Sequence, residues 1–144
     1  MALVYFVPGL RIILGLLFIG SSVLKLPDLN GFSAAVASFN LFPRWAVKPI
    51  AYTIPFVEFI VGWWVLSGKS LLYAAYTGLV IMLVTTLVIF IALLLKRKVK
   101  NCGCYGTVIV VPLTWNKFVE NIIWTILFVL LIFGTKDLML LGII

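Results

Sequence analysis

Long apolar runs separated by short polar segments make up most of the chain. Four stretches, residues 3–24, 49–67, 71–95 and 115–134, are long enough to cross a bilayer core, which takes roughly 20 helical residues. Large apolar side chains occur on all sides of these stretches, as is typical of helices that face lipid. The pattern predicts an all-α, polytopic membrane protein with a four-transmembrane-helix bundle and one domain over residues 1–144.

The connection between the first two predicted spans carries a helix signal of its own. Three residues that can cap a helix start lie near its beginning: Asp28, Asn30 and Ser33. Three apolar residues then share one helical face: Phe32, Val36 and Phe39. We therefore expect a short interfacial helix between the first and second spans that ends before Pro43.

Composition and charge narrow the class of protein. Hydrophobic residues make up 65% of the 144 residues and charged residues 10%, which gives more apolar surface than a soluble domain of this size can bury. The net charge is +7, but the basic residues lie between the spans, where Lys and Arg contact anionic lipid headgroups. The sequence predicts a multi-pass protein of the cell membrane, with the lipid bilayer rather than nucleic acid as its partner.

Basic residues are unevenly divided between the two ends of the predicted spans. One end carries Lys69 and Lys136. The other end carries Lys25, Arg44, Lys48, Lys96, Arg97, Lys98, Lys100 and Lys117. The positive-inside rule therefore predicts that the connection after the third span, which holds both cysteines, is cytoplasmic and that both termini are outside.

The chain contains no histidine, which excludes histidine-based catalytic triads, histidine-ligated metals and histidine proton relays. Its two cysteines exclude a four-cysteine zinc site and a framework of several disulfides, and no metal site is predicted. Thiols and a few carboxylates remain as the reactive groups.

Cys102 and Cys104 are the candidate catalytic residues, in the segment "KRKVKNCGCYG". A disulfide across one residue closes a small, strained ring, for which Gly103 supplies backbone freedom, and such disulfides are easily reduced. The basic residues before the cysteines favour the reactive thiolate. This pattern indicates thiol-disulfide exchange. Soft-metal capture and a loop whose cysteines never pair are the alternatives.

Two charged residues lie inside predicted spans. Arg11 is about eight residues and Glu58 about nine residues from the same end of their spans, or roughly 12 and 13 Å deep. Similar depth predicts an Arg11–Glu58 ion pair, which either fixes the helix register or forms a proton or quinone-headgroup site.

Trp63 is a candidate stacking surface for a quinone ring, or else an anchor at the membrane interface. Glu120 is expected to pair with Lys117, with acceptance of a thiol proton as the alternative.

The segments "LRIILGLLFIGSSVLKLPDLNGF", "FP", "PFVEFIVGWWVLSG", "CGCYG" and "LTWNKFVEN" resemble, in this order, the DoxX-like membrane proteins, and most closely the branch typified by the methylamine-utilisation protein MauE. The resemblance implies a four-helix membrane protein that handles disulfides with thioredoxin-like partners, with a membrane quinone as candidate electron acceptor. By position, Cys102 and Cys104 would match the redox pair of the family, and Arg11 and Glu58 its intramembrane polar pair.

The sequence and the resemblance together therefore predict a membrane thiol-disulfide redox protein that exchanges disulfides with a thioredoxin-like partner, with a membrane quinone or a second partner protein as the oxidant that restores the pair. One alternative is a carrier of mercury or copper, which would need a homo-oligomer because each chain offers only two thiolates. The other is a non-catalytic membrane subunit of a redox complex, in which Arg11 and Glu58 are purely architectural.

Overall fold

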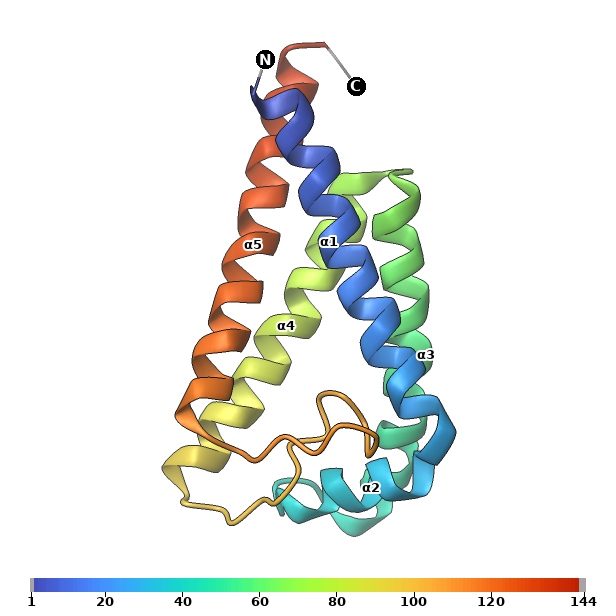
Figure 1. The fold of residues 1–144 in the computed structure, drawn as a ribbon, viewed down its shortest axis with the longest axis vertical. Coiled ribbons are helices and arrows are strands. Elements are labelled where there is room, and N and C mark those ends of the chain that lie inside the picture. Colours follow the sequence, from blue (N-terminus) through green and yellow to red (C-terminus); the bar gives the residue numbers. More distant parts are fainter. Residues whose placement is uncertain (1, 143–144) are drawn as a thin grey trace.

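The computed structural model describes residues 2–142, which form helices and the turns that connect them. The elements in chain order are α1 (Ala2–Lys25), the 3-10 turn η1 (Leu26–Asp28), α2 (Leu29–Ser38), α3 (Arg44–Ser67), α4 (Leu71–Leu94) and α5 (Trp115–Leu140) (Figure 1). Four helices are long and apolar enough to span a membrane, which confirms the predicted all-α class. Both termini lie at one end of the bundle, and the loop between α4 and α5 lies at the other (Figure 1).

Two of the long helices extend beyond their predicted bounds. α3 begins at Arg44 rather than at residue 49, because Arg44 and Lys48 are exposed on its first turns and Pro43 precedes it. α5 continues past residue 134 to Leu140, and Lys136 on its last turns lies 5.6 Å from the centre of the Tyr76 ring. In both helices, polar residues that suggested a helix end are accommodated on an exposed face.

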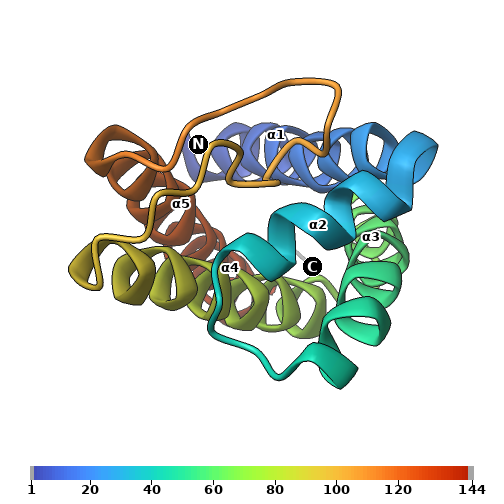
Figure 2. The same ribbon diagram turned by 90° about the horizontal axis from the view of Figure 1, so that it is seen from below.

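The predicted interfacial helix is confirmed as α2, which crosses the end of the bundle that carries the loop before α5 (Figure 2). The Asp28 carboxylate accepts a hydrogen bond of 2.7 Å from the Gly31 amide and caps the first turn of the helix. The three residues predicted to share one face, Phe32, Val36 and Phe39, are all buried. Their side chains pack against α3 and α4 and are shielded from water.

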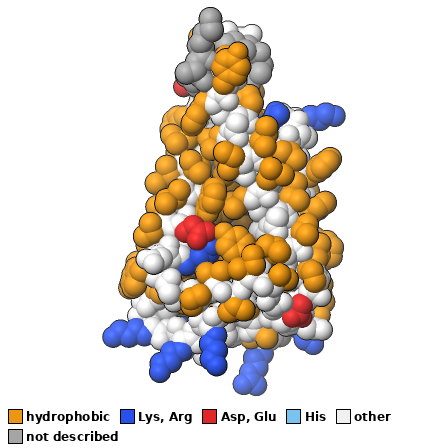
Figure 3. Space-filling view, viewed as in Figure 1, with side chains coloured by type: hydrophobic (Ala, Val, Ile, Leu, Met, Phe, Trp, Pro, Cys, Tyr) orange, Lys and Arg blue, Asp and Glu red, His pale blue; other side chains and the backbone are white. Residues whose placement is uncertain are grey.

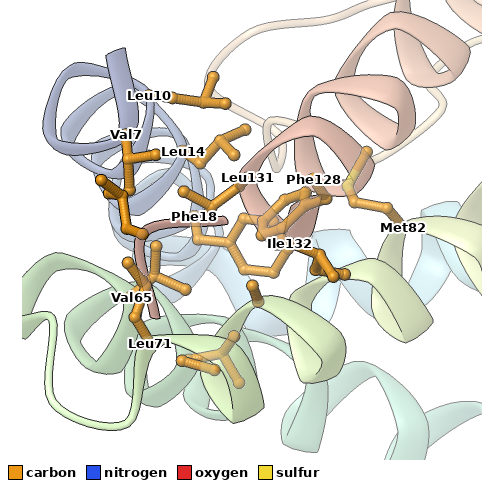
Figure 4. Close-up of a cluster of buried hydrophobic side chains, with 14 residues drawn as sticks. Val7, Leu10, Leu14, Phe18, Val65, Leu71, Met82, Phe128, Leu131 and Ile132 are labelled. Carbon is orange, nitrogen blue, oxygen red and sulfur yellow. The ribbon is translucent and has the colours of Figure 1, made fainter. Parts of the chain in front are cut away.

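The core of the bundle lies between α1, α3, α4 and α5 (Figure 4). Phe18 of α1 meets Phe128 of α5 edge to face, with ring centres 5.3 Å apart. Leu14, Val65 and Leu131 are buried around these rings. On the outside, apolar side chains cover the middle of the visible face, while Lys and Arg gather at its lower end (Figure 3).

Two glycines set the register of α1 against α3. A Cβ atom built on Gly15 would lie 3.0 Å from the Gly62 carbonyl oxygen, and one built on Gly62 would lie 2.9 Å from the Gly15 carbonyl oxygen. The absence of side chains at both positions therefore lets the two backbones approach closely, as in small-residue packing between membrane helices. This contact places the last two turns of α1 opposite Pro55 and Glu58 of α3.

Candidate redox site at the loop end of the bundle

Cys102 and Cys104 lie in the loop of residues 95–114, and the structure places their sulfur atoms at bonding distance from each other. Cys102 is buried and Cys104 is half-buried. Gly103 has a φ of +72°, in the left-handed region that favours glycine, and its position against the Phe32 ring leaves little room for a side chain. The pair is therefore held against α2 rather than projecting freely from the bundle.

Asn101 organises the cysteine loop from within. Its side-chain amide donates to the Gly106 carbonyl oxygen at 2.9 Å, and its side-chain oxygen accepts from the Gly103 amide at 3.0 Å. The Cys102 amide in turn donates to the Val111 carbonyl oxygen at 2.7 Å. One side chain thus satisfies the amide between the two cysteines and a carbonyl group that follows them, a role that suits the ability of asparagine to hydrogen-bond nearby backbone.

The loop is fastened to the end of α1. The Ser21 hydroxyl lies 2.9 Å from the Cys104 carbonyl oxygen, and the Thr107 hydroxyl donates to the Asp28 carboxylate at 3.0 Å. Gly106 has a φ of +68°, and a Cβ atom at this position would collide with the Leu24 carbonyl group. These contacts bring the cysteine pair to the last turns of α1.

A buried ion pair lies beside this attachment point. Lys25 Nζ is 2.6 Å and 2.7 Å from the two carboxylate oxygens of Glu58, and both side chains are largely buried. Lys25 Nζ also donates to the Ser21 hydroxyl at 3.0 Å. Ser21 Oγ lies 3.3 Å from Glu58, so its single hydrogen can serve either Glu58 or the Cys104 carbonyl oxygen. Ser21 therefore connects the ion pair to the cysteine loop.

The predicted Arg11–Glu58 ion pair is wrong, because Glu58 pairs with Lys25. Equal depth was inferred by counting from the ends of the helices, but α1 begins farther out than α3 ends (Figure 1). The Gly15–Gly62 contact places Arg11 beside Gly68, the left-handed C-cap of α3, where a guanidinium complements the negative end of the helix dipole.

Two other predicted residues can now be placed. Trp63 is 63% exposed on the outer face of α3, a position suited to a membrane anchor. The predicted pairing of Lys117 with Glu120 is confirmed, with a separation of 2.7 Å.

Glu120 is the centre of a second polar cluster. It accepts hydrogen bonds from the Tyr105 hydroxyl at 2.7 Å and from the Trp124 indole at 3.4 Å, and Lys117 Nζ lies 4.2 Å from the centre of the Tyr105 ring. Burial raises the pKa of the Tyr105 phenol, and the hydrogen bond to the Glu120 carboxylate raises it further. Tyr105 therefore stays protonated and donates to Glu120 at neutral and mildly alkaline pH.

Two cavities meet at Cys104 and the Lys25–Glu58 ion pair. A small cavity of about 60 Å³ between α1, α4 and α5 is lined by Cys104, Lys25, Glu58 and Lys117 among others. A larger one of about 380 Å³ between α2, α3 and α4 is lined by both cysteines, Lys25 and Glu58 together with apolar side chains. On the face of Figure 3, acidic and basic groups lie next to each other beside a hollow in the apolar surface.

Comparison with known proteins identifies the family. The family model described as methylamine utilisation protein MauE matches residues 2–134. The chain belongs to the MauE family. It is 29% identical over 119 residues to the methylamine utilization protein MauE of Paracoccus denitrificans, a match that covers 83% of this chain. The chain spans 64% of the length of that relative. No solved structure matches it.

In this MauE-family chain, sequence reasoning located the cysteines and Glu58 but missed residues that surround them. The sequence pattern assigns Lys25 only to the basic residues of a connection, whereas in the structure it is 4% exposed and lines both cavities. Its spacing of four residues from Ser21 was the available signal, because such residues neighbour each other on a helix. By contrast, Lys96, Lys98 and Lys100 of the predicted thiolate-stabilising run are exposed. The cations that share a cavity with Cys104 are Lys25 and Lys117.

Proposed function

We propose that this MauE-family protein is a membrane thiol-disulfide oxidoreductase that exchanges disulfides with a thioredoxin-like partner through Cys102 and Cys104. The observation that carries the proposal is the placement of the two sulfur atoms at bonding distance, in a loop fastened to α1 beside a buried ion pair. The Paracoccus relative is named for methylamine utilization, and we extend a role in that process to this chain.

Exchange begins with a thiolate of the partner attacking one sulfur of the Cys102–Cys104 disulfide. This forms a mixed disulfide and releases the other sulfur as a thiolate. The second thiolate of the partner then attacks the mixed disulfide, so the partner leaves as a disulfide and this chain is left as a dithiol. Two electrons pass from the partner to the cysteine pair, and a membrane quinone is the proposed oxidant that restores the pair.

The surroundings of the pair support this chemistry. A thiolate that leaves during exchange carries negative charge, and nearby cations stabilise it. Cys104 shares a cavity with the ammonium groups of Lys25 and Lys117, and it is less buried than Cys102. The backbone of the loop is held at Asn101 and Ser21, which keeps Cys104 beside these cations.

The decisive experiment is the capture of the mixed disulfide. We expect the purified, oxidised chain to form a covalent adduct with a reduced thioredoxin that keeps its attacking cysteine but has serine at the second one. The double variant Cys102→Ser/Cys104→Ser should form none, while Val108→Ser, which places a serine on the exposed part of the same loop, should form the adduct as the unmodified chain does. Nonreducing electrophoresis and mass spectrometry measure the adduct. No adduct with the unmodified chain, or equal yields from the double variant, would refute the proposal.

Thiol labelling in intact cells tests the oxidation state and the orientation of the loop. We expect neither cysteine to react with a membrane-permeant maleimide until a reductant is added, because the proposal requires the two sulfurs to be bonded to each other. After reduction, a membrane-impermeant maleimide added outside the cells should leave both thiols unmodified, as the charge asymmetry predicts a cytoplasmic loop. Labelling without reductant contradicts the disulfide, and labelling by the impermeant reagent contradicts the orientation.

A further inference from the structure

The cavity of about 380 Å³ between α2, α3 and α4 has one polar end, and its other walls are apolar except for Thr85, whose hydroxyl donates to the Ile81 carbonyl oxygen. Lys25, Glu58 and the two cysteines with Gly103 form the polar end. Aromatic rings in the wall come from Phe32, Phe39 and Phe42. The volume falls within the range of about 300–1,000 Å³ that is common for small-molecule sites, and apolar walls with a few polar groups are typical of them.

The cavity adjoins a second one of about 460 Å³ between α3 and α4. Both are lined by Ile54, Glu58 and Val84. The second cavity is also lined by Val57 and Val80, which are 39% and 57% exposed and lie near the middle of their helices. Because the middle of a spanning helix faces hydrocarbon, a ligand that enters between α3 and α4 comes from the lipid phase.

We propose that this cavity is the binding site for the ring of a membrane quinone, which enters from the bilayer between α3 and α4, and that Lys25 donates a hydrogen bond to a quinone carbonyl oxygen. The inference deepens the proposed function and rests on it for the redox role of the site. Three observations support a quinone: a lipid-side entrance, aromatic walls and a single cationic donor beside the cysteine pair.

A quinone at this site also balances the electrons and protons of the reaction. When the two thiols form their S–S bond, they release two electrons and two protons. A quinone is the lipid-soluble class of acceptor that takes up both, becoming a quinol. Lys25 has two hydrogen bonds to one carboxylate, so it can give one of them to a carbonyl oxygen and remain paired with Glu58. Negative charge that develops on that oxygen is then stabilised by the ammonium group.

The inference replaces the quinone contacts predicted from sequence at Arg11 and Trp63. Neither residue lines the cavity, whereas Glu58 does. Arg11 lies by Gly68 at the opposite end of the bundle from the cysteine loop, and the Trp63 side chain is mostly exposed. Lys25 and the aromatic residues Phe32, Phe39 and Phe42 become the residues that contact the ring.

Photoaffinity labelling of the full chain tests the site. The probe is an azido derivative of a short-chain ubiquinone, with decylubiquinone as competitor, applied to detergent-solubilised protein. We expect labelled peptides from α2, α3 or α4 that include cavity-lining residues, and loss of the label with excess decylubiquinone. Ile54→Trp fills the junction of the two cavities and should weaken binding at least tenfold. Ile60→Trp places the same side chain on an exposed position of the same helix, and should bind as the unmodified chain does.

Three results would overturn the inference. They are labelling that decylubiquinone does not compete away, equal labelling of Ile54→Trp and unmodified protein, and a cavity filled by a phospholipid acyl chain that decylubiquinone does not displace.

Labelling of Cys102→Ser/Cys104→Ser separates this inference from the proposed function, because quinone binding does not need the sulfurs. If that variant binds the probe but the unmodified chain forms no thioredoxin adduct, disulfide exchange is wrong and the site stands. An adduct without specific probe binding leaves exchange standing and removes the site.

Discussion

Replacement of Glu58 by leucine is expected to destabilise the protein by about 3–5 kcal/mol, because it leaves the ammonium group of Lys25 buried without its counter-charge. Lys25 is 4% exposed, and the hydroxyl of Ser21 is the hydrogen-bond acceptor that remains to it. The free energy of unfolding can be followed in detergent by thermal denaturation. Lys48→Met, which removes an exposed cation from the first turns of α3, should change it by less than about 0.5 kcal/mol.

The double variant Lys25→Met/Glu58→Leu should recover most of this loss, since replacing both members of a buried ion pair by apolar residues is often neutral. A double-mutant cycle then gives a large coupling between Lys25 and Glu58. The same cycle with Arg11→Met should give a coupling near zero, because Arg11 lies by Gly68. A coupling that is larger for Arg11 than for Lys25 would restore the pairing predicted from sequence and contradict the structure.

Gly15→Leu is expected to force α1 away from α3 and to lower stability by about 1–3 kcal/mol or more, the usual cost of overpacking. The Cβ atom alone would lie 3.0 Å from the Gly62 carbonyl oxygen and from Leu66, so the rest of a leucine side chain has no space. Since the same contact sets the register of Lys25 against Glu58, the variant should also lower the yield of the thioredoxin adduct.

Gly20→Leu is the matched control for this prediction. It makes the same chemical change in the same helix, with the same gain in helix propensity, but a Cβ atom at residue 20 meets nothing within 4 Å. Its unfolding temperature should stay close to that of the unmodified protein, while that of Gly15→Leu falls. Equal melting of the two variants would show that the close approach of α1 and α3 contributes little to stability.

The fold was largely predictable from the sequence because each spanning helix must be a long apolar run, whatever it packs against. The same reasoning located α2, since Asp28 and the spacing of Phe32, Val36 and Phe39 act locally. Contacts between residues on different helices were harder to predict from the sequence. The pairing of Glu58 depends on how far α1 slides along α3, and that offset is set by two glycines whose contact no periodicity reveals.

The candidate site shows the same division between local and long-range information. Cys102 and Cys104 are close in sequence, so their proximity could be predicted, as could the pairing of Lys117 with Glu120. Lys25 could be assigned only to the end of a span, where lysines commonly reach toward water. Its side chain turns inward because Glu58, 33 residues later, offers a carboxylate there. The cavities likewise depend on the packing of three separate helices.

The unequal heights of the helices have a consequence for the surrounding bilayer. α1 and α5 extend beyond the turn that joins α3 to α4 (Figure 1), and the apolar side chains of Val4, Phe6 and Leu140 near their outer ends are exposed. The apolar surface is therefore taller on one side of the molecule than on the other. Lipids compensate for such hydrophobic mismatch by thickening, thinning or letting the protein tilt. We expect bilayer thickness to set the tilt of this protein, and with it the depth at which the opening between α3 and α4 meets the acyl chains.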